Sequence, residues 1–210
     1  MVRGGAVMRP VLHHGDLPEA VELGPVVAVD TETMGLDPFR DRLCLVQLTD
    51  GGGTVHLVRI ERGQRAAPRL AAVLSDPKRL KVLHFARFDL AMLRHHLRIT
   101  CAPVWCTKIA SKLVRTYTDR HGLKDLCREL LGVELSKTEQ SSDWGGESFS
   151  EAQLRYAASD VVHLHALKER LEAMLEREER RALAEACMAF LPTRVELDLA
   201  GFAGLDPFAH

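Results

Sequence analysis

Three consecutive glycines at positions 51–53 limit the fold more than any other short segment of the chain. They lie between the apolar run 43–49 and the alternating segment 54–58, which is the pattern of a tight turn between two strands. Residues 26–30 form an earlier apolar run, typical of a buried strand. Three strands in sequence with short connections predict an antiparallel meander.

The next segments predict helices packed on a mixed sheet. Residues 66–74 carry a helical pattern, residues 81–85 are expected to form a fourth strand, and a helix is expected from about 87 to 96. This order is typical of an α/β fold. After Cys106 the pattern is almost entirely helical. The expected helices cover residues 107–114, 123–131 and 150 to about 190.

The sequence marks the start of the last helical stretch, and the segment that follows this stretch is apolar. Ser150 and Gln153 fit a capping box, which places the start of the helix that carries Asp160. We expect one domain over residues 1–210, with an apolar segment over about 192–210. That segment is too apolar for a free terminus, so it either packs on the body or forms a subunit contact.

Composition and charge exclude several classes of protein. The 210 residues are 46% hydrophobic and 27% charged, which excludes a disordered or fibrous chain. No apolar run approaches the ~18 residues of a membrane-spanning helix, and residues 1–10 do not resemble a signal peptide, so we expect a cytoplasmic protein without a membrane partner. Lys plus Arg number 28 against 29 for Asp plus Glu, so any phosphate binding must be local. The five cysteines have no metal-binding spacing and are expected to be buried thiols.

Asp30 and Glu32 lie at the end of the first predicted strand, two residues apart. In an extended chain their side chains leave on the same face, where two carboxylates repel each other unless cations hold them together. The alternative is a solvated strand end that leads into the turn at Gly35. From this pair alone both interpretations stay open.

Asp160 lies four residues after Tyr156, so the two share a helix face. Its neighbours are small or apolar, which makes a carboxylate unfavourable there unless a metal or a partner such as Arg155 or Lys168 compensates it. Asp89 repeats the situation after the fourth predicted strand. Four acidic residues from three segments indicate one oxygen-lined site for Mg²⁺ or Mn²⁺. Two such ions can clamp both oxygens of a phosphoryl displacement, which predicts phosphodiester hydrolysis.

The segments around these residues resemble the three exonuclease motifs of the DEDDy 3′→5′ exonucleases, in the order of that family. Position 155 is Arg, where the histidine variant of the family has His, so Tyr156 takes the place of the family's tyrosine. A further segment resembles the one before the third motif in ribonuclease D. The sequences are DTET at 30–33, HFARFD at 84–89, YAASD at 156–160 and KTEQSSDW at 137–144.

Within that superfamily the chain resembles the NanoRNase C family of compact bacterial enzymes over nearly its whole length. The likeness is carried by residues 41–44, 106–113, 115–124 and 208–210. The chain departs from ribonuclease D in lacking the additional C-terminal helical domains that help hold longer RNA. Full tRNA processing is therefore not expected.

The resemblance implies a ribonuclease H-like α/β fold, with a mixed sheet flanked by helices, and two divalent ions, Mg²⁺ or Mn²⁺, in each active site. It implies that Asp30, Glu32, Asp89 and Asp160 hold these ions, and that Tyr156 orients or deprotonates the attacking water. A phenol with a pKa near 10 is a weak base, so the metals must supply most of the activation. The implied products are nucleoside 5′-monophosphates from very short RNA, and the implied assembly is a closed homo-octamer.

Six residues outside the metal set are predicted to bind substrate: Met34, Leu36, His84, Lys108, Arg115 and Trp144. Leu36 is expected between the last two bases and His84 on the terminal phosphate, although each also fits an ordinary turn or strand end. Lys108 and Arg115 share a helix face that suits either a phosphate clamp or a solvated surface. Together with the segment 140–144 they are candidates for capping a 5′-phosphate.

The sequence therefore predicts a 3′-5′ exoribonuclease with 5′-phosphorylated dinucleotides as its best substrates. The near-neutral charge removes the long-range attraction that a processive enzyme would use on long RNA. Three alternatives stay open: ribonuclease D-like trimming of longer RNA, a DNA 3′-5′ exonuclease, and a catalytically inactive nucleic-acid-binding module with the same fold.

Overall fold

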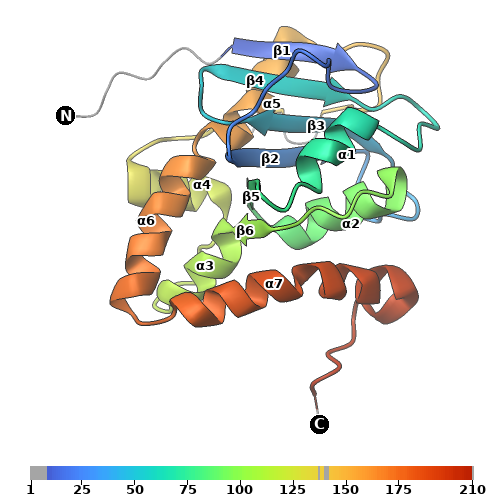
Figure 1. Ribbon diagram of the computed structural model, residues 1–210. Coiled ribbons are helices and arrows are strands. Elements are labelled where there is room, and N and C mark those ends of the chain that lie inside the picture. Colours follow the sequence, from blue (N-terminus) through green and yellow to red (C-terminus); the bar gives the residue numbers. More distant parts are fainter. Residues whose placement is uncertain (1–8, 137, 140–141, 210) are drawn as a thin grey trace.

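The computed structural model describes residues 9–136, 138–139 and 142–209 (Figure 1). Its centre is a six-stranded mixed sheet in the order β1-β4-β3-β2-β5-β6. The strands are β1 (Arg9–His14), β2 (Val26–Thr33), β3 (Leu43–Thr49), β4 (Thr54–Arg59), β5 (Leu80–Leu83) and β6 (Val104–Cys106). The predicted meander is confirmed, because β2, β3 and β4 pair antiparallel in sequence order.

The sequence does not predict the two edge strands of the sheet, β1 and β6. β1 pairs parallel with β4, and β6 pairs parallel with β5. β1 has only two aliphatic residues and β6 is three residues long, so neither shows a strand periodicity in the sequence. β2 continues past Asp30 to Thr33, which keeps both acidic residues of the first motif inside the strand. The fourth predicted strand ends at Leu83 rather than at residue 85.

Helices cover both faces of the sheet (Figure 1). α2 lies against one face, α5 lies against the other over β2, β3 and β4, and α3, α6 and α7 form a further layer beside β5 and β6. The helices are α1 (Pro68–Leu74), α2 (Ala86–Leu97), α3 (Thr107–Val114), α4 (Leu123–Leu126), α5 (Glu151–Val162), α6 (Leu164–Arg177) and α7 (Arg181–Leu197), with π-helical turns η1 (Cys127–Leu131) and η2 (Asp198–Phe202). The predicted α/β architecture is therefore confirmed.

The long helix expected from 150 to about 190 is divided into three helices. His163 separates α5 from α6, and Glu179, with φ 54°, lies between α6 and α7. Neither position carries the Gly or Pro that marks a helix end in a sequence. The capping box at the start of α5 is confirmed: Ser150 Oγ accepts from Gln153 N at 3.1 Å, and Gln153 Oε1 accepts from Ser150 N at 2.9 Å.

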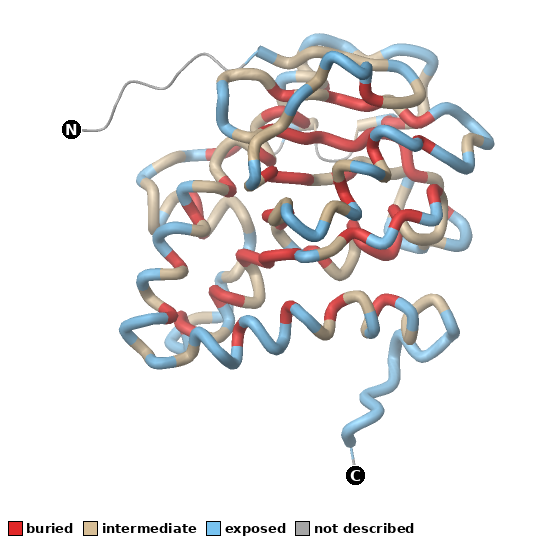
Figure 2. The backbone as a smooth tube through the Cα atoms, viewed as in Figure 1, coloured by how far each residue is buried: buried red, intermediate tan, exposed pale blue. Residues whose placement is uncertain are grey.

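β3 is the most enclosed strand, because helices cover both of its faces and strands flank both of its edges. All of its residues are buried, including the polar Gln47 and Thr49, and Figure 2 shows the buried positions concentrated in the sheet. Four cysteines are buried as expected, whereas Cys187 is exposed on α7. In the described part of the chain no helix combines the length and hydropathy needed to span a membrane.

The C-terminal segment is attached to the body by charged contacts. Arg87 of α2 and Arg194 of α7 both bind the carboxylate of Asp198, and both arginines also donate to the carbonyl of Ala203. The same segment leaves apolar side chains at the surface. These exposed residues are Phe202, Leu205 and Phe208.

Candidate active site

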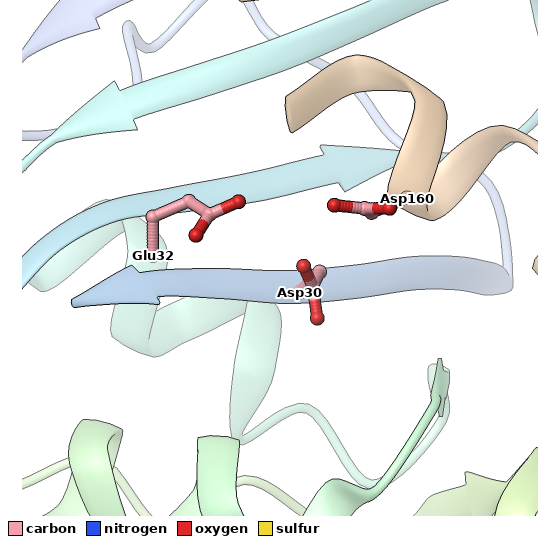
Figure 3. A group of neighbouring side chains, drawn as sticks. All are labelled: Asp30, Glu32 and Asp160. Carbon is pink, nitrogen blue, oxygen red and sulfur yellow. The ribbon is translucent and has the colours of Figure 1, made fainter. Parts of the chain in front are cut away.

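β2 and α5 bring three carboxylates together on one face of the sheet (Figure 3). Asp30 and Glu32 alternate with Thr31 along β2, so both acidic side chains leave on the face that α5 covers. Asp160, near the C-terminal end of α5, points toward them. One carboxylate oxygen from each of the three lies within 4.8 Å of the others. The structure thus brings together three of the four predicted metal ligands.

Asp89 reaches the same region from the opposite side of β2. It lies in the first turn of α2, where its carboxylate is buried and accepts a hydrogen bond from Thr31 Oγ1 at 2.6 Å. β5 pairs only with residues 26–28 of β2, so the edge of β2 beside Thr31 is left to α2. Asp89 lines the same cavity as the other acids, but its oxygens are outside the group that lies within 4.8 Å.

In the described part of the chain these carboxylates have no positively charged side chain as a partner. Among the described residues, no Lys, Arg or His forms an ion pair with Asp30, Glu32, Asp89 or Asp160. The surface partners considered for Asp160 bind elsewhere. Arg155 pairs with Glu151 at 3.1 Å and Lys168 pairs with Glu172 at 2.6 Å. The interpretation of Asp160 as one half of a surface ion pair is therefore wrong.

Burial raises the pKa of all four carboxyl groups. The pKa of Asp89 and that of Asp160 rise to about 7, that of Glu32 rises to about 9, and that of Asp30 rises well above its ordinary value. Neighbouring carboxylates add to the effect of burial at Asp30 and Glu32, whereas the hydrogen bond from Thr31 opposes it at Asp89. The group is therefore arranged to carry full negative charge only when cations compensate it.

This set of donors fits hard divalent cations. Carboxylate oxygens are the ligands that Mg²⁺ and Mn²⁺ prefer, and within the described chain no His or Cys belongs to the group. Uncompensated negative charge in a half-buried cavity is the electrostatic complement of such ions. Asp30, Glu32 and Asp160 are arranged to ligate together, and Asp89 adds a fourth carboxylate at the same cavity.

Tyr156 lies one turn before Asp160 on the same face of α5. Burial, followed by the neighbouring carboxylates, raises the pKa of its phenol above the ordinary value. Its ring lies 6.2 Å, centre to centre, from that of Trp144, which packs on Phe149 at 5.8 Å. Trp144 lines the cavity but is only 2% exposed. The buried Trp144 ring supports Tyr156, and the substrate contact expected for Trp144 stays a prediction.

A cavity of about 530 Å³ surrounds the carboxylates. Five of the six predicted substrate-binding residues line it: Met34, Leu36, His84, Lys108 and Trp144. Leu36 lies at its rim with 80% of its surface exposed. The leucine therefore offers an apolar face to the solvent beside the carboxylate group.

The turn that presents Leu36 is held in place from within the protein. Thr33 Oγ1 donates to the carbonyl of Gly35 at 2.6 Å, and the Asp41 carboxylate accepts from Asp37 N at 3.0 Å. A Cβ atom at Gly35 would lie 2.3 Å from Asp41 Oδ2. Glycine at this position is required by that close approach.

Arg115 is the predicted substrate residue that the structure places away from the cavity. Its side chain is fully buried, and its guanidinium pairs with Glu129 and donates to the Arg120 carbonyl at 2.6 Å and to Ser111 Oγ at 3.2 Å. The structure corrects the expectation that Arg115 caps a phosphate, because Glu129 already compensates its charge. Positions 140 and 141 of the predicted cap lie outside the described residues.

His84 is a neutral side chain in the cavity wall. Burial, and then Lys108, lowers the pKa of His84 to about 3. Thr107 Oγ1 donates to the carbonyl of Leu83 at 3.2 Å, so His84 Nδ1 donates to Thr107 Oγ1 at 2.8 Å. This network assigns the proton to Nδ1 and leaves Nε2 as an acceptor. An Nε2 acceptor suits a substrate hydroxyl, and the phosphate contact expected for His84 stays a prediction.

Several residues of the cavity wall lie outside the predicted set, among them Phe85, Phe88 and Lys124. Phe85 is 46% exposed in a left-handed conformation with φ 61°. It stacks on Phe88 with ring centres 6.5 Å apart, and Lys108 Nζ lies 4.0 Å from the centre of its ring. Both phenylalanines belong to the segment HFARFD. Because aromatic side chains stack on bases, their presence in this segment could have indicated a base-binding surface.

Comparison with known proteins identifies relatives of this chain. A family model described as 3′-5′ exonuclease matches residues 15–176. The structure of Brucella melitensis NrnC with bound Mg²⁺ is 55% identical, with 97% of this chain and 100% of that chain covered and a TM-score of 0.91. The structure of the same protein bound to pGG is 56% identical, with 97% and 99% covered and a TM-score of 0.92.

The curated relatives are longer proteins. Ribonuclease D from Gluconacetobacter diazotrophicus is 35% identical over 77% of this chain and 41% of its own length. The chain therefore spans about two-fifths of that relative. Together these likenesses confirm the predicted ribonuclease H-like fold, in which a mixed sheet carries the acidic residues.

Proposed function

The chain belongs to the 3′-5′ exonuclease family and, within it, to the ribonuclease D-like NanoRNase C group, and on this basis we propose that it is a DEDDy-type exoribonuclease acting on very short RNA. The observation that carries the proposal is the group of acidic side chains beside Tyr156 in one cavity, with no cationic partner among the residues that the structure describes. A nucleic-acid-binding module without activity has no need of four uncompensated carboxylates.

In this proposal Asp30, Glu32, Asp89 and Asp160 hold two divalent ions, Mg²⁺ or Mn²⁺. When bound, such ions lower the pKa of a water and stabilise charge on the oxygens of a phosphoryl group. The hydrogen bond from Thr31 fixes the orientation of Asp89 for this purpose. The related Brucella NrnC, described with bound Mg²⁺, supports the choice of metal.

The remaining side chains act on the water and on the substrate. The Tyr156 hydroxyl orients or deprotonates the attacking water, and the buried Trp144 holds the Tyr156 ring in place. Leu36 and Phe85 offer apolar faces to the bases. His84 Nε2 accepts a hydrogen bond from a hydroxyl of the terminal ribose, since its other nitrogen is bound to Thr107.

We further propose that 5′-phosphorylated dinucleotides are the best substrates and nucleoside 5′-monophosphates the products. The related NrnC bound to pGG supports this choice. The net charge of -1 provides no long-range attraction for a long strand, so binding depends on local cations. Lys108 and Lys124 line the cavity and take the capping role that Arg115 cannot fill.

The test is to measure turnover of RNAs of two, three and seven nucleotides, each with and without a 5′-phosphate, in Mg²⁺ and in Mn²⁺. We expect the 5′-phosphorylated dinucleotide to be hydrolysed fastest. Lys108→Gln should reduce that preference. Lys112→Gln, on the same helix α3 but outside the cavity wall, should leave it unchanged.

Two other outcomes would replace the proposal with one of its alternatives. Equal rates at all three lengths would show that the cavity is open to longer strands and favour ribonuclease D-like trimming. Faster hydrolysis of a DNA dinucleotide than of its RNA counterpart would favour a DNA exonuclease, because a hydroxyl contact at His84 would then contribute nothing. No hydrolysis of any of these substrates with either metal would refute the enzyme assignment.

We also propose that the apolar segment at about 192–210 is a subunit contact in a closed homo-octamer. The exposure of Phe202, Leu205 and Phe208 supports this proposal, because such side chains are unfavourable in water. Light scattering at micromolar concentration tests it. A monomer mass would refute the assembly and leave the exonuclease proposal unchanged.

A further inference from the structure

Gln47 is a polar residue buried in the centre of the sheet. It lies in the middle of β3 with none of its surface exposed, and within the described chain neither Oε1 nor Nε2 has a hydrogen-bond partner. An unsatisfied amide in a protein interior costs about 1–3 kcal/mol. An aliphatic side chain of the same size would avoid that cost, so the amide needs an explanation outside the packing of the core.

The strand register places Gln47 beside the carboxylate group. Its direct partners across the sheet are Asp30 on β2 and Leu57 on β4. Directly opposite residues project their side chains on the same face, with Cβ atoms about 4.5–5.5 Å apart. α5, which carries Asp160, covers this face of β2, β3 and β4. The Gln47 amide therefore lies between the sheet and α5, next to the Asp30 side chain.

The carboxylates differ in the support they receive from neighbouring side chains. Asp89 accepts from the hydroxyl of Thr31, and Asp160 is hydrogen-bonded with Tyr156. Asp30 receives a backbone hydrogen bond from Thr31 and, in the described residues, no hydrogen bond from a side chain. Carboxylates that bind metals are usually held by such outer hydrogen bonds.

We propose that Gln47 is a positioning residue for Asp30: its Nε2, which has no partner in the described chain, donates to the Asp30 carboxylate once a divalent cation is bound and holds that carboxylate toward the cation. The inference rests on the proposed function, since it assumes that the carboxylates bind metal. A neutral amide suits this position because it supplies a donor without positive charge. A lysine or arginine there would compensate Asp30 and weaken cation binding.

The experiment compares the parent protein with Gln47→Met, which keeps the length of the side chain and removes both polar atoms. Thermal unfolding is followed without metal and across a series of Mg²⁺ concentrations. We expect the unfolding temperature without metal to be unchanged or higher, because an unsatisfied polar group is removed. We expect the Mg²⁺ concentration for half-maximal stabilisation to rise about tenfold, which is typical of losing an outer hydrogen bond to a metal ligand.

Leu57→Met is the matched control, because it introduces the same side chain on the other side of Gln47. Its Mg²⁺ midpoint should equal that of the parent. If Gln47→Met does not fold, Gln47→Asn keeps the amide but shortens its reach, and it should shift the midpoint in the same direction. A midpoint unchanged in the folded Gln47 variant, whatever its stability without metal, overturns the inference.

The failure of the inference is distinguishable from the failure of the proposed function. A parent protein that Mg²⁺ and Mn²⁺ do not stabilise at any concentration would overturn both. A parent that Mg²⁺ stabilises, together with a Gln47 variant that responds identically, would overturn only the role of Gln47. Activity at saturating Mg²⁺ should recover to within about threefold of the parent, because the change acts on the affinity for metal.

Discussion

The carboxylate of Asp198 lies between two arginines, whereas those of Asp30, Glu32 and Asp160 lie beside one another with no cation in the described residues. Arg87 Nε is 2.5 Å from one oxygen of Asp198, and Arg194 Nη2 is 2.8 Å from the other. Both regions hold partly buried acids. The fold compensates the negative charge in one region and leaves it uncompensated in the other.

The difference separates a structural role from a functional one. Around Asp198 the charges are paired and attach the C-terminal segment to α2 and α7. Uncompensated charge at the carboxylate group destabilises the protein without metal, and such an arrangement persists only where it serves binding or catalysis. Variants in the two regions should therefore have opposite consequences for activity and for stability.

The largest effect is expected from Asp160→Asn. Removing a metal ligand forfeits several kcal/mol of transition-state stabilisation, so turnover of a dinucleotide should fall by about a thousandfold or more. Stability without metal should stay the same or increase, because one of the mutually repelling carboxylates is gone. Measured kcat and unfolding in chelator check both statements. Asp198→Asn is the matched control and should keep activity within a few-fold of the parent.

The second-largest effect is expected from Mg²⁺ binding, which should stabilise the protein through the carboxylate group and not through Asp198. At a Mg²⁺ concentration about one hundred times Kd, binding should stabilise the folded parent by about 2.7 kcal/mol, which is about 5–10 °C in Tm for a chain of this size. Chelator should reverse this increase. The increase should disappear in Asp160→Asn and remain in Asp198→Asn. An equal rise in both variants would mean that the ion binds elsewhere.

Asp198→Asn should reduce the free energy of unfolding by about 2 kcal/mol, between the values typical of exposed and of buried pairs. The estimate is intermediate because Asp198 and Arg194 are largely buried, whereas Arg87 is 41% exposed. Denaturant unfolding in chelator measures it. Glu196→Gln breaks the more exposed pair with Arg94 and should change stability by less than about 1 kcal/mol.

The smallest effect concerns His84, a titratable group in the cavity wall that has no acidic partner among the described residues. Its pKa is about 3 in the folded chain and 6.5 ordinarily, so below pH 6.5 the unfolded chain binds more protons. The stability that neutral His84 contributes is therefore present above pH 6.5 and is lost as the pH falls toward 3.

Between pH 7.5 and 5.5 the parent should lose about 1 kcal/mol more stability than His84→Gln. Denaturant unfolding of the metal-free proteins at the two pH values measures the difference. His14→Gln removes an exposed histidine of β1 and should follow the parent. An identical loss in the parent and in His84→Gln would show that His84 is accessible to protons in the folded state.

The parts of the site that follow from local geometry could be predicted from the sequence. The alternation of Asp30 and Glu32, the spacing of Tyr156 and Asp160, and the cap at Ser150 depend only on the repeat of a strand or a helix. Arg115 could not be placed in this way. Its helix face predicts contact with solvent or phosphate, but η1 brings Glu129 against it. Charge pairing between separate segments depends on the tertiary structure, so the periodicity of one helix cannot predict it.

The two edge strands of the sheet could not be predicted from the sequence for a related reason. β1 and β6 are strands because β4 and β5 offer free edges to them, and their own residues carry little preference. The break between α6 and α7 at Glu179 likewise depends on how α7 packs beneath α3 and α6 rather than on a local signal. The proton on His84 Nδ1 follows from Thr107 of the neighbouring strand end.

The carboxylate group joins β2, near the start of the chain, to α5, in its last third. During synthesis on the ribosome Asp30 and Glu32 leave the exit tunnel long before Asp160 does. An unfinished chain, still attached beside the messenger that encodes it, therefore holds only part of the donor set. Under the proposed function, hydrolysis of short RNA begins only when α5 docks on the sheet, so a prematurely terminated product is inactive.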